Sequence, residues 1–254
     1  MSGKAILGGA LIIFAATLAG GGVYALHTLK ERRFDPETLC PLEGVKAVTL
    51  IIIDKTDPLT PAEQARIRDL VSEERDSVQR GGRLTVRLLQ QRPGASETAL
   101  DTLADLCNPG NEANPLFENP KRIAARYEAG FREPIQGALA SFESAGPAPV
   151  SPIAAAIHAG LEAVPASAGR HLKLVLISDL MEHTAEASAY AGTLSEAALR
   201  KAMPESTRMR LNGAEIRIVL LARPRHAQRQ DASVEIWRRF LRAASQREPD
   251  MVRP

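Results

Sequence analysis

Two apolar segments of the chain each run directly into an aspartate. Residues 45–53 end at Asp54, and residues 172–177 end at Ser178 and Asp179. Both segments are rich in β-branched residues and almost continuously apolar, which is the pattern of a strand buried on both faces of a parallel sheet. Strands of this kind need helices on both sides of the sheet, so they restrict the chain to a layered α/β fold.

The sequence around these two strands alternates between helix and strand patterns. Thr60, Pro61 and Glu63 form a capping-box sequence, which predicts a helix from Thr60 to the glycine pair at 81–82. A strand at 84–89 completes a βαβ unit. The other predicted elements are helices at 120–129, 133–142 (kinked at Pro134), 151–164 (with Ser151 as N-cap), 195–203 and 232–246, and a strand at 214–221. The alternation predicts a doubly wound, mostly parallel α/β sheet with helices on both faces, built from residues 34–254 as one domain.

The N-terminus differs from this pattern, because residues 5–26 carry no charged side chain. A helix over such a run matches the roughly 30 Å hydrocarbon core of a bilayer. We therefore expect residues 1–33 to form a transmembrane anchor and its flank. A cleaved signal peptide with Val23 and Ala25 at its cleavage site is the alternative, although the run exceeds the usual apolar core of about 7–15 residues.

Two features disagree about the side of the membrane on which the domain lies. Lys30, Arg32 and Arg33 follow the apolar run and favour the cytoplasm. Cys40 and Cys107 both lie in turn-rich sequence, as disulfide cysteines commonly do, and a disulfide requires an oxidising compartment.

The predicted topology brings the two cysteines together. If the segment after residue 94 returns antiparallel to the strand at 84–89, Cys107 finishes at the same end of the sheet as Cys40. We expect a Cys40–Cys107 disulfide in a bacterial single-pass protein of the inner (cytoplasmic) membrane, with its domain on the periplasmic side. Two unrelated free thiols are the alternative.

The two strand-end aspartates are the candidate functional residues. In a doubly wound sheet, ligands bind beyond the carboxyl ends of the strands, where the strand order reverses. Asp54, Thr56, Ser151 and Asp179 would all reach this edge and form an oxygen-only ligand set, which suits Mg²⁺ or another hard divalent cation. The alternative is structural, since an Asp or Thr after a strand also caps helices and bonds to neighbouring backbone amides.

These residues resemble the von Willebrand factor A domain, whose metal-ion-dependent adhesion site uses D-x-S-x-S after the first strand, a Thr from a later loop and an Asp after the fourth strand. In "DKTDP", Asp54 and Thr56 match the first two positions and Pro58 replaces the last hydroxyl; "VSPI" resembles T-P-L with Ser151, and "LISDL" resembles T-D-G with Asp179 but no Gly. The resemblance covers about residues 44–247. It implies a non-catalytic domain that binds another protein through a degenerate metal site, in a membrane-associated complex.

A second resemblance starts from the same stretch. "DKTDPLT" is similar to D-K-T-G-T-L-T of P-type ATPases in the haloacid dehalogenase superfamily, which implies a phosphatase or phosphotransferase with Asp54 as nucleophile. Asp57 and Pro58 replace the Gly and Thr of that motif. The distal metal-binding pair would be Asp179 with Glu182, without the family's G-D-x-x-N-D form.

Other function classes find little support in the sequence. A formal net charge of +2 and 4% aromatic residues do not indicate a nucleic-acid partner. The sequence contains no G-x-S-x-G, Walker or G-x-G-x-x-G motif. The residues Glu182 and His183 lack zinc-site spacing, which favours a solvated helix start at that point.

Overall fold

The computed structural model describes residues 21, 34–91, 98–114, 118–140, 142, 146–165 and 171–253. The predicted membrane span at 5–26 lies outside this set apart from position 21. Within the described ranges, no helix combines the length and the apolarity that crossing a bilayer requires.

The described strands form one mixed sheet, in the order β3-β2-β1-β4-β5-β6. β3 pairs antiparallel with β2, and every other pair is parallel. The strand bounds are Val48–Asp54 (β1), Arg83–Gln91 (β2), Thr98–Cys107 (β3), Leu172–Ser178 (β4), Glu215–Leu220 (β5) and Asp250–Val252 (β6). The doubly wound, mostly parallel arrangement is confirmed, and the strand order reverses between β1 and β4, where such sheets bind ligands.

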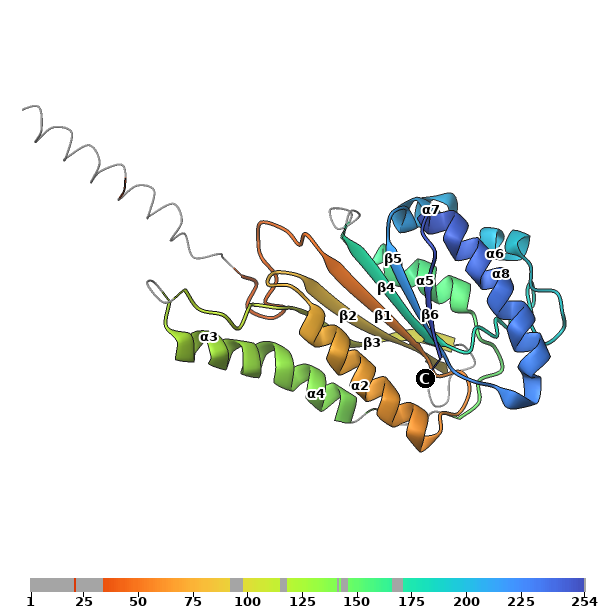
Figure 1. Cartoon of the computed structure of the whole chain (residues 1–254), viewed down its shortest axis with the longest axis horizontal. Coiled ribbons are helices and arrows are strands. Elements are labelled where there is room, and N and C mark those ends of the chain that lie inside the picture. Colours follow the sequence, from red (N-terminus) through yellow and green to blue (C-terminus); the bar gives the residue numbers. More distant parts are fainter. Residues whose placement is uncertain are drawn as a thin grey trace, which may run out of the picture.

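Helices cover both faces of the sheet (Figure 1). One core packs against α2 and the α3–α4 segment, and the other packs against α5 to α8. The helix bounds are Pro61–Ser77 (α2), Pro120–Tyr127 (α3), the π-helix Glu128–Arg132 (η1), Glu133–Ala140 (α4), Ile153–Glu162 (α5), Glu196–Ala202 (α6), Glu205–Leu211 (α7), the 3-10 helix Pro224–His226 (η3) and Ala227–Ser245 (α8).

Strand β1 explains why both faces are covered. Leu50 and Ile52 belong to one core, while Ile51 and Ile53 belong to the other, and all four are fully buried. Each such side chain contributes roughly 1.5–3 kcal/mol when it is removed from water. A strand with this pattern is stable only at the centre of a sheet between two helical layers, as the sequence predicted.

Four elements differ from the sequence prediction. The helices predicted at 120–129 and 133–142 are joined by the π-helix η1, and Pro134, where a kink was predicted, lies in the first turn of α4. Helix α7 and strand β6 were not predicted, and α8 begins at Ala227 rather than near residue 232.

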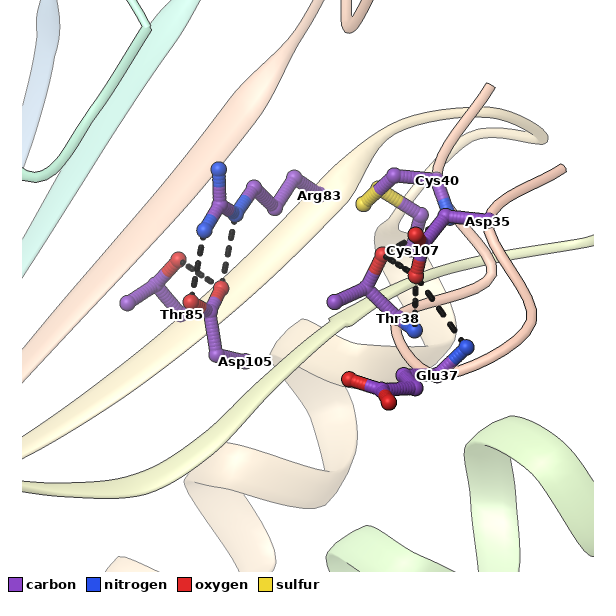
Figure 2. The surroundings of a disulfide bond; sticks show 8 residues. All are labelled: Asp35, Glu37, Thr38, Cys40, Arg83, Thr85, Asp105 and Cys107. Carbon is purple, nitrogen blue, oxygen red and sulfur yellow. Dashed lines mark hydrogen bonds and ion pairs between the residues drawn. A yellow bond between two sulfur atoms is a disulfide. The ribbon is translucent and has the colours of Figure 1, made fainter. Parts of the chain in front are cut away.

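A disulfide joins Cys40 to Cys107, with a Cα–Cα distance of 4.8 Å, and this confirms the predicted pairing (Figure 2). Cys107 is the last residue of β3 and pairs with Arg83, the first residue of β2. The backbone N–H of Cys107 also donates to the Thr38 carbonyl oxygen at 2.8 Å. The segment that precedes β1 is therefore fastened to the end of the sheet opposite Asp54.

Candidate functional site

The candidate site lies at the carboxyl ends of β1 and β4, the two neighbouring strands at the centre of the sheet. Asp54 is the last residue of β1, Ser178 is the last residue of β4, and Asp179 follows directly. The structure thus brings both strand-end aspartates to one edge, as predicted from the rule for parallel strands.

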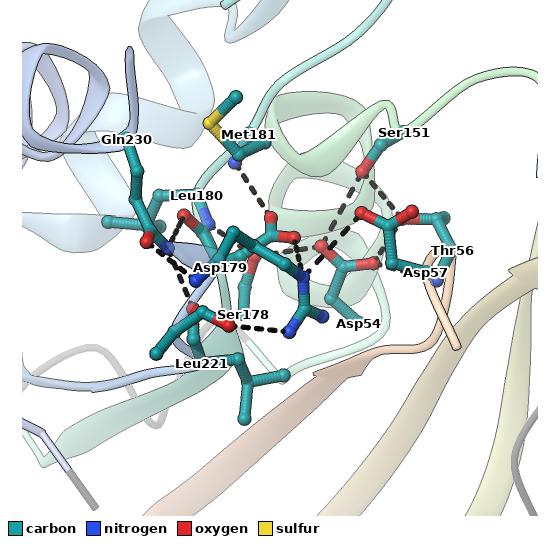
Figure 3. Close-up of polar contacts among 12 residues, drawn as sticks. Asp54, Thr56, Asp57, Ser151, Ser178, Asp179, Leu180, Met181, Leu221 and Gln230 are labelled. Carbon is teal, nitrogen blue, oxygen red and sulfur yellow. Dashed lines mark hydrogen bonds and ion pairs between the residues drawn. The ribbon is translucent and has the colours of Figure 1, made fainter. Parts of the chain in front are cut away.

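Asp54 lies in a buried cluster of hydroxyl groups, which we call the Asp54 cluster: Asp54, Thr56, Ser151 and Ser178 (Figure 3). Thr56 donates to Asp54 Oδ1 from its backbone N–H at 3.0 Å, and Thr56 Oγ1 lies 2.6 Å from the same oxygen. Ser178 Oγ donates to Asp54 Oδ2 at 2.7 Å. Ser151 Oγ lies 2.8 Å from Thr56 Oγ1 and 3.5 Å from Asp54 Oδ2. Asp54 is only 4% exposed, and this burial raises the pKa of its carboxyl group.

Asp179 is held by a different set of donors. Its Oδ1 accepts from the backbone N–H of Met181 at 2.8 Å, and its Oδ2 accepts from Arg223 Nε at 2.9 Å. Burial and the nearby negative charge of Asp54 raise the pKa of Asp179, and the positive charge of Arg223 acts in the opposite direction. The carboxyl groups of Asp54 and Asp179 are therefore close enough to interact electrostatically, although they have different hydrogen-bond partners.

Arg223 reaches this edge from the loop after β5. Its NH1 group lies 3.0 Å from Glu63 Oε1 in the first turn of α2, and its Nε lies 3.8 Å from Asp57 Oδ2. We call Arg223, Asp179, Glu63 and Asp57 the arginine cluster. Arg223 was not among the predicted site residues, although a charged residue two positions beyond the apolar strand run that ends at Leu221 is a signal in the sequence.

Ser151 has a role that differs from the predicted one. It does not cap α5, since the N-cap residue is Pro152. Instead, its backbone forms an isolated bridge with His183, and its hydroxyl joins the Asp54 cluster. Glu182, from the loop after β4, caps the N-terminus of α5, because its Oε2 accepts from the Ala154 N–H at 2.9 Å. Glu182 is only 2% exposed, so the predicted solvated helix start at 182–183 is wrong.

Leu180 has an unusual backbone for a leucine. Its φ is +60°, in the left-handed region, and its side chain is fully buried. A bulky residue rarely adopts this conformation, which glycine adopts without cost, and the resemblance to T-D-G places a glycine at this position. The hydroxyl of Ser178 accepts from the Leu180 N–H at 2.9 Å and supports the turn.

The chemistry of the predicted ligand set suits a hard divalent ion, but its arrangement does not. Oxygen atoms of Asp54, Thr56 and Ser151 converge, whereas Asp179 faces Arg223 and already accepts from two N–H donors. Across the part of the chain that the structure describes, no three His, Cys, Asp or Glu side chains form a group that could hold a metal. A divalent ion at Asp179 would first require Arg223 to move away. The metal site stays a prediction.

The geometry also bears on the possibility of a carboxylate nucleophile. A nucleophile needs an oxygen that an incoming substrate can reach, and Asp54 is buried with both oxygens hydrogen-bonded. The two residues predicted as the distal metal-binding pair have separate partners, because Asp179 pairs with Arg223 while Glu182 caps α5.

Comparison with known proteins gives structural neighbours only. The sequence matches no protein-family model and no curated protein sequence. An aerotolerance-related membrane protein from Bacteroides fragilis is 11% identical, with a TM-score of 0.38, over 82% of this chain and 91% of that one. The conserved hypothetical protein BatB from Bacteroides thetaiotaomicron is 12% identical, with a TM-score of 0.38, over 83% and 90%. A von Willebrand factor type A protein from Catenulispora acidiphila is 10% identical, with a TM-score of 0.41, over 77% and 43%.

Proposed function

We propose that this chain is a membrane-anchored, non-catalytic protein-binding module. Its domain would be von Willebrand factor A-like, and its binding surface would be the edge of the sheet that carries the Asp54 cluster and the arginine cluster. The observation that carries this proposal is the separation of the two ends of the sheet. The segment after the predicted anchor is fastened at the end with the disulfide, and the polar clusters lie at the other end. A partner would therefore meet the polar edge on the side away from the membrane.

The anchor is the second part of the proposal. Residues 5–26 would cross the inner membrane once and leave residues 34–254 on the periplasmic side. The Cys40–Cys107 disulfide supports this orientation, because disulfides persist in oxidising compartments and are rare in the cytosol. A domain held at the membrane in this way is suited to binding another protein of a membrane-associated complex.

The partly exposed members of the arginine cluster would make the first contact with the partner. Asp57 is 34% exposed, and Tyr190 OH donates to its Oδ2 at 3.4 Å. The residues behind Asp57 are buried and mutually hydrogen-bonded, so they would keep their geometry when a partner binds. A preformed surface of this kind binds without the entropy cost of ordering a loop.

A divalent cation at Asp54, Thr56, Ser151 and Asp179 is the alternative form of the same site. The convergence of three oxygen-bearing side chains supports it, and the Asp179–Arg223 ion pair counts against it. The haloacid dehalogenase-like activity has no comparable support. Incubation with acetyl phosphate or a phosphatase substrate plus Mg²⁺ tests it, and turnover that disappears in Asp54→Asn would replace the binding proposal.

Site-specific photo-cross-linking of the full-length chain in its own membrane tests the binding proposal. A photoreactive amino acid at position 57 should give one discrete adduct, and the same amino acid at position 42 should give none. Leu42 is the matched control because it is 65% exposed and lies before β1, at the opposite end of the sheet. The adduct should weaken in Asp179→Ala. Equal adducts from both positions, or an adduct from position 57 that is insensitive to Asp179→Ala, would contradict the proposal.

A further inference from the structure

Arg223 is held in a fixed position before any ligand binds. Its backbone N–H donates to Gln230 Oε1 at 2.9 Å, and Pro224 starts the short helix η3 directly after it. Gln230 also donates to the carbonyl oxygens of Asp179 at 3.0 Å and of Leu221 at 2.7 Å. One buried glutamine thus ties the loop of Arg223 to the loop of Asp179.

Three structural elements direct carboxylates at the Arg223 guanidinium. Asp179 follows β4, Glu63 lies in the first turn of α2, and Asp57 lies in the loop between β1 and α2. Glu63 is itself fixed by the capping box, since its Oε2 accepts from the Thr60 N–H at 2.8 Å. Arg223 therefore meets acceptors that are already in place.

The two buried carboxyl groups at this edge need a positive charge or hydrogen-bond donors. Asp54 and Asp179 are 4% and 3% exposed, and two buried carboxylates in one space are costly unless a positive charge or hydrogen-bond donors offset them. The Arg223 side chain is only 16% exposed. A guanidinium stays charged at all ordinary pH values and directs five donors outward in one plane, so it can serve carboxylates from several directions.

We propose that Arg223 is the resident cation of this site and takes the place of a divalent ion. Hydroxyl groups then donate hydrogen bonds to the Asp54 carboxylate, and the Arg223 guanidinium donates to the Asp179 carboxylate. The site therefore keeps its geometry without a metal ion. Arg223 is a positioning residue, because it fixes Asp179 and Glu63 relative to each other. If the protein-binding proposal also holds, cross-linking from position 57 is unaffected by a metal chelator.

Metal titration of the purified full-length chain tests this inference without any partner. Mn²⁺ is added to the wild type, Asp179→Asn, Arg223→Gln and the double variant Arg223→Gln/Asp179→Asn, with bound Mn²⁺ followed by electron paramagnetic resonance and unfolding by circular dichroism. The wild type should bind no more Mn²⁺ than Asp179→Asn. Arg223→Gln should gain one saturable Mn²⁺ site at least tenfold tighter than any in the wild type, and the double variant should lose it.

Arg217→Gln is the matched control. Arg217 also pairs with a buried carboxylate, Glu74 Oε1 at 3.0 Å, but it lies within β5, away from the predicted ligands. This variant should gain no Mn²⁺ site. If Arg223→Gln does not fold, then Arg223→Lys, which keeps the charge, should fold and remain without Mn²⁺, and that pair of results supports the inference.

Two results would overturn the inference. The first is Mn²⁺ binding by the wild type that disappears in Asp179→Asn, and the second is an Arg223→Gln variant that unfolds at the wild-type temperature and binds no Mn²⁺. The protein-binding proposal fails separately, through the cross-linking experiment alone. Asp179-dependent Mn²⁺ binding by a wild type that still cross-links from position 57 would remove only the role of Arg223.

Discussion

Glu182 caps helix α5 from a distant loop, because its Oε2 accepts a 2.9 Å hydrogen bond from the backbone N–H of Ala154, 28 positions earlier. A helix N-terminus favours negative charge, since its first N–H groups have no partner within the helix. Burial nevertheless raises the pKa of Glu182 from 4.5 to about 7, and the charge of Asp54 adds to this rise, while the Ala154 N–H lowers it. The cap is therefore formed by a carboxyl group that titrates near neutral pH.

Glu182→Gln should change how stability depends on pH. A carboxyl group with a raised pKa in the folded state stabilises the protein below its unfolded pKa, and that stability is lost as the pH rises through the folded value. The variant should therefore match the wild type near pH 4.5 and exceed it above pH 7, by a few kcal/mol at about 1.4 kcal/mol per pKa unit. Urea unfolding at several pH values measures the difference, with exposed Glu186→Gln as the control. Parallel curves for the wild type and Glu182→Gln would contradict the prediction.

Ser178→Ala should destabilise the domain more than another buried serine substitution does. Ser178 Oγ donates to the Asp54 carboxylate and also accepts from the Leu180 N–H. Its loss leaves Asp54 Oδ2 with only the longer 3.5 Å contact to Ser151 Oγ and removes the acceptor of the Leu180 N–H, which supports a left-handed residue. We expect a cost of about 2–3 kcal/mol. Ser245→Ala is the control, because Ser245 is equally buried but donates to a neutral carbonyl of its own helix at 2.9 Å. An equal loss in the two variants would show that the charge of Asp54 does not matter.

The parts of this structure that could be predicted depend on local pattern or on general rules of sheet topology. The uninterrupted apolar runs before Asp54 and Asp179 predicted two central strands, and the shared edge of parallel strands then placed both aspartates together. The antiparallel return of β3 placed Cys107 beside Cys40 in the same way. Each inference needed only the direction of a strand.

The remaining features depend on contacts between distant segments, which no local pattern encodes. Ser151 and Pro152 have the sequence of a helix start, and α5 does begin at Ile153, but the Ser151 backbone pairs with His183 and Glu182 provides the capping carboxylate instead. Helix α7 is shorter than the roughly 12 residues that an isolated helix needs to be stable in water, and strand β6 is shorter than a usual strand. Both elements therefore depend on packing against the rest of the domain. Arg223 acquires its role only because the end of β5 lies next to β4.

Removing the disulfide should destabilise the domain without changing its fold. The bridge closes a loop between positions 67 residues apart, and a bridge of this kind contributes about 2–4 kcal/mol. Cys40→Ser/Cys107→Ser should therefore unfold at lower urea concentration with an unchanged far-ultraviolet circular dichroism spectrum. In intact cells, a membrane-impermeant thiol reagent should label the wild type only after reduction. Labelling without reductant would argue against the bond, and no labelling even after reduction would argue against the proposed periplasmic location.

Substitution of Gly130 tests whether Leu39, in the segment before β1, packs against the π-helix η1. A Cβ at Gly130, in the π-helix, would lie 2.5 Å from Leu39 Cδ1, whereas a Cβ at Gly137 in α4 would have nothing within 4 Å. Gly130→Ala should therefore cost about 1 kcal/mol through overpacking, while Gly137→Ala should stabilise by roughly 0.5–1 kcal/mol through helix propensity. Because the clash is with one side chain, adding Gly130→Ala to Leu39→Ala should cost nothing further. Urea unfolding of the wild type, Gly130→Ala, Leu39→Ala and the double variant gives the coupling energy between the two residues. If Gly130→Ala costs the same with and without Leu39, the two residues do not pack as the structure has them.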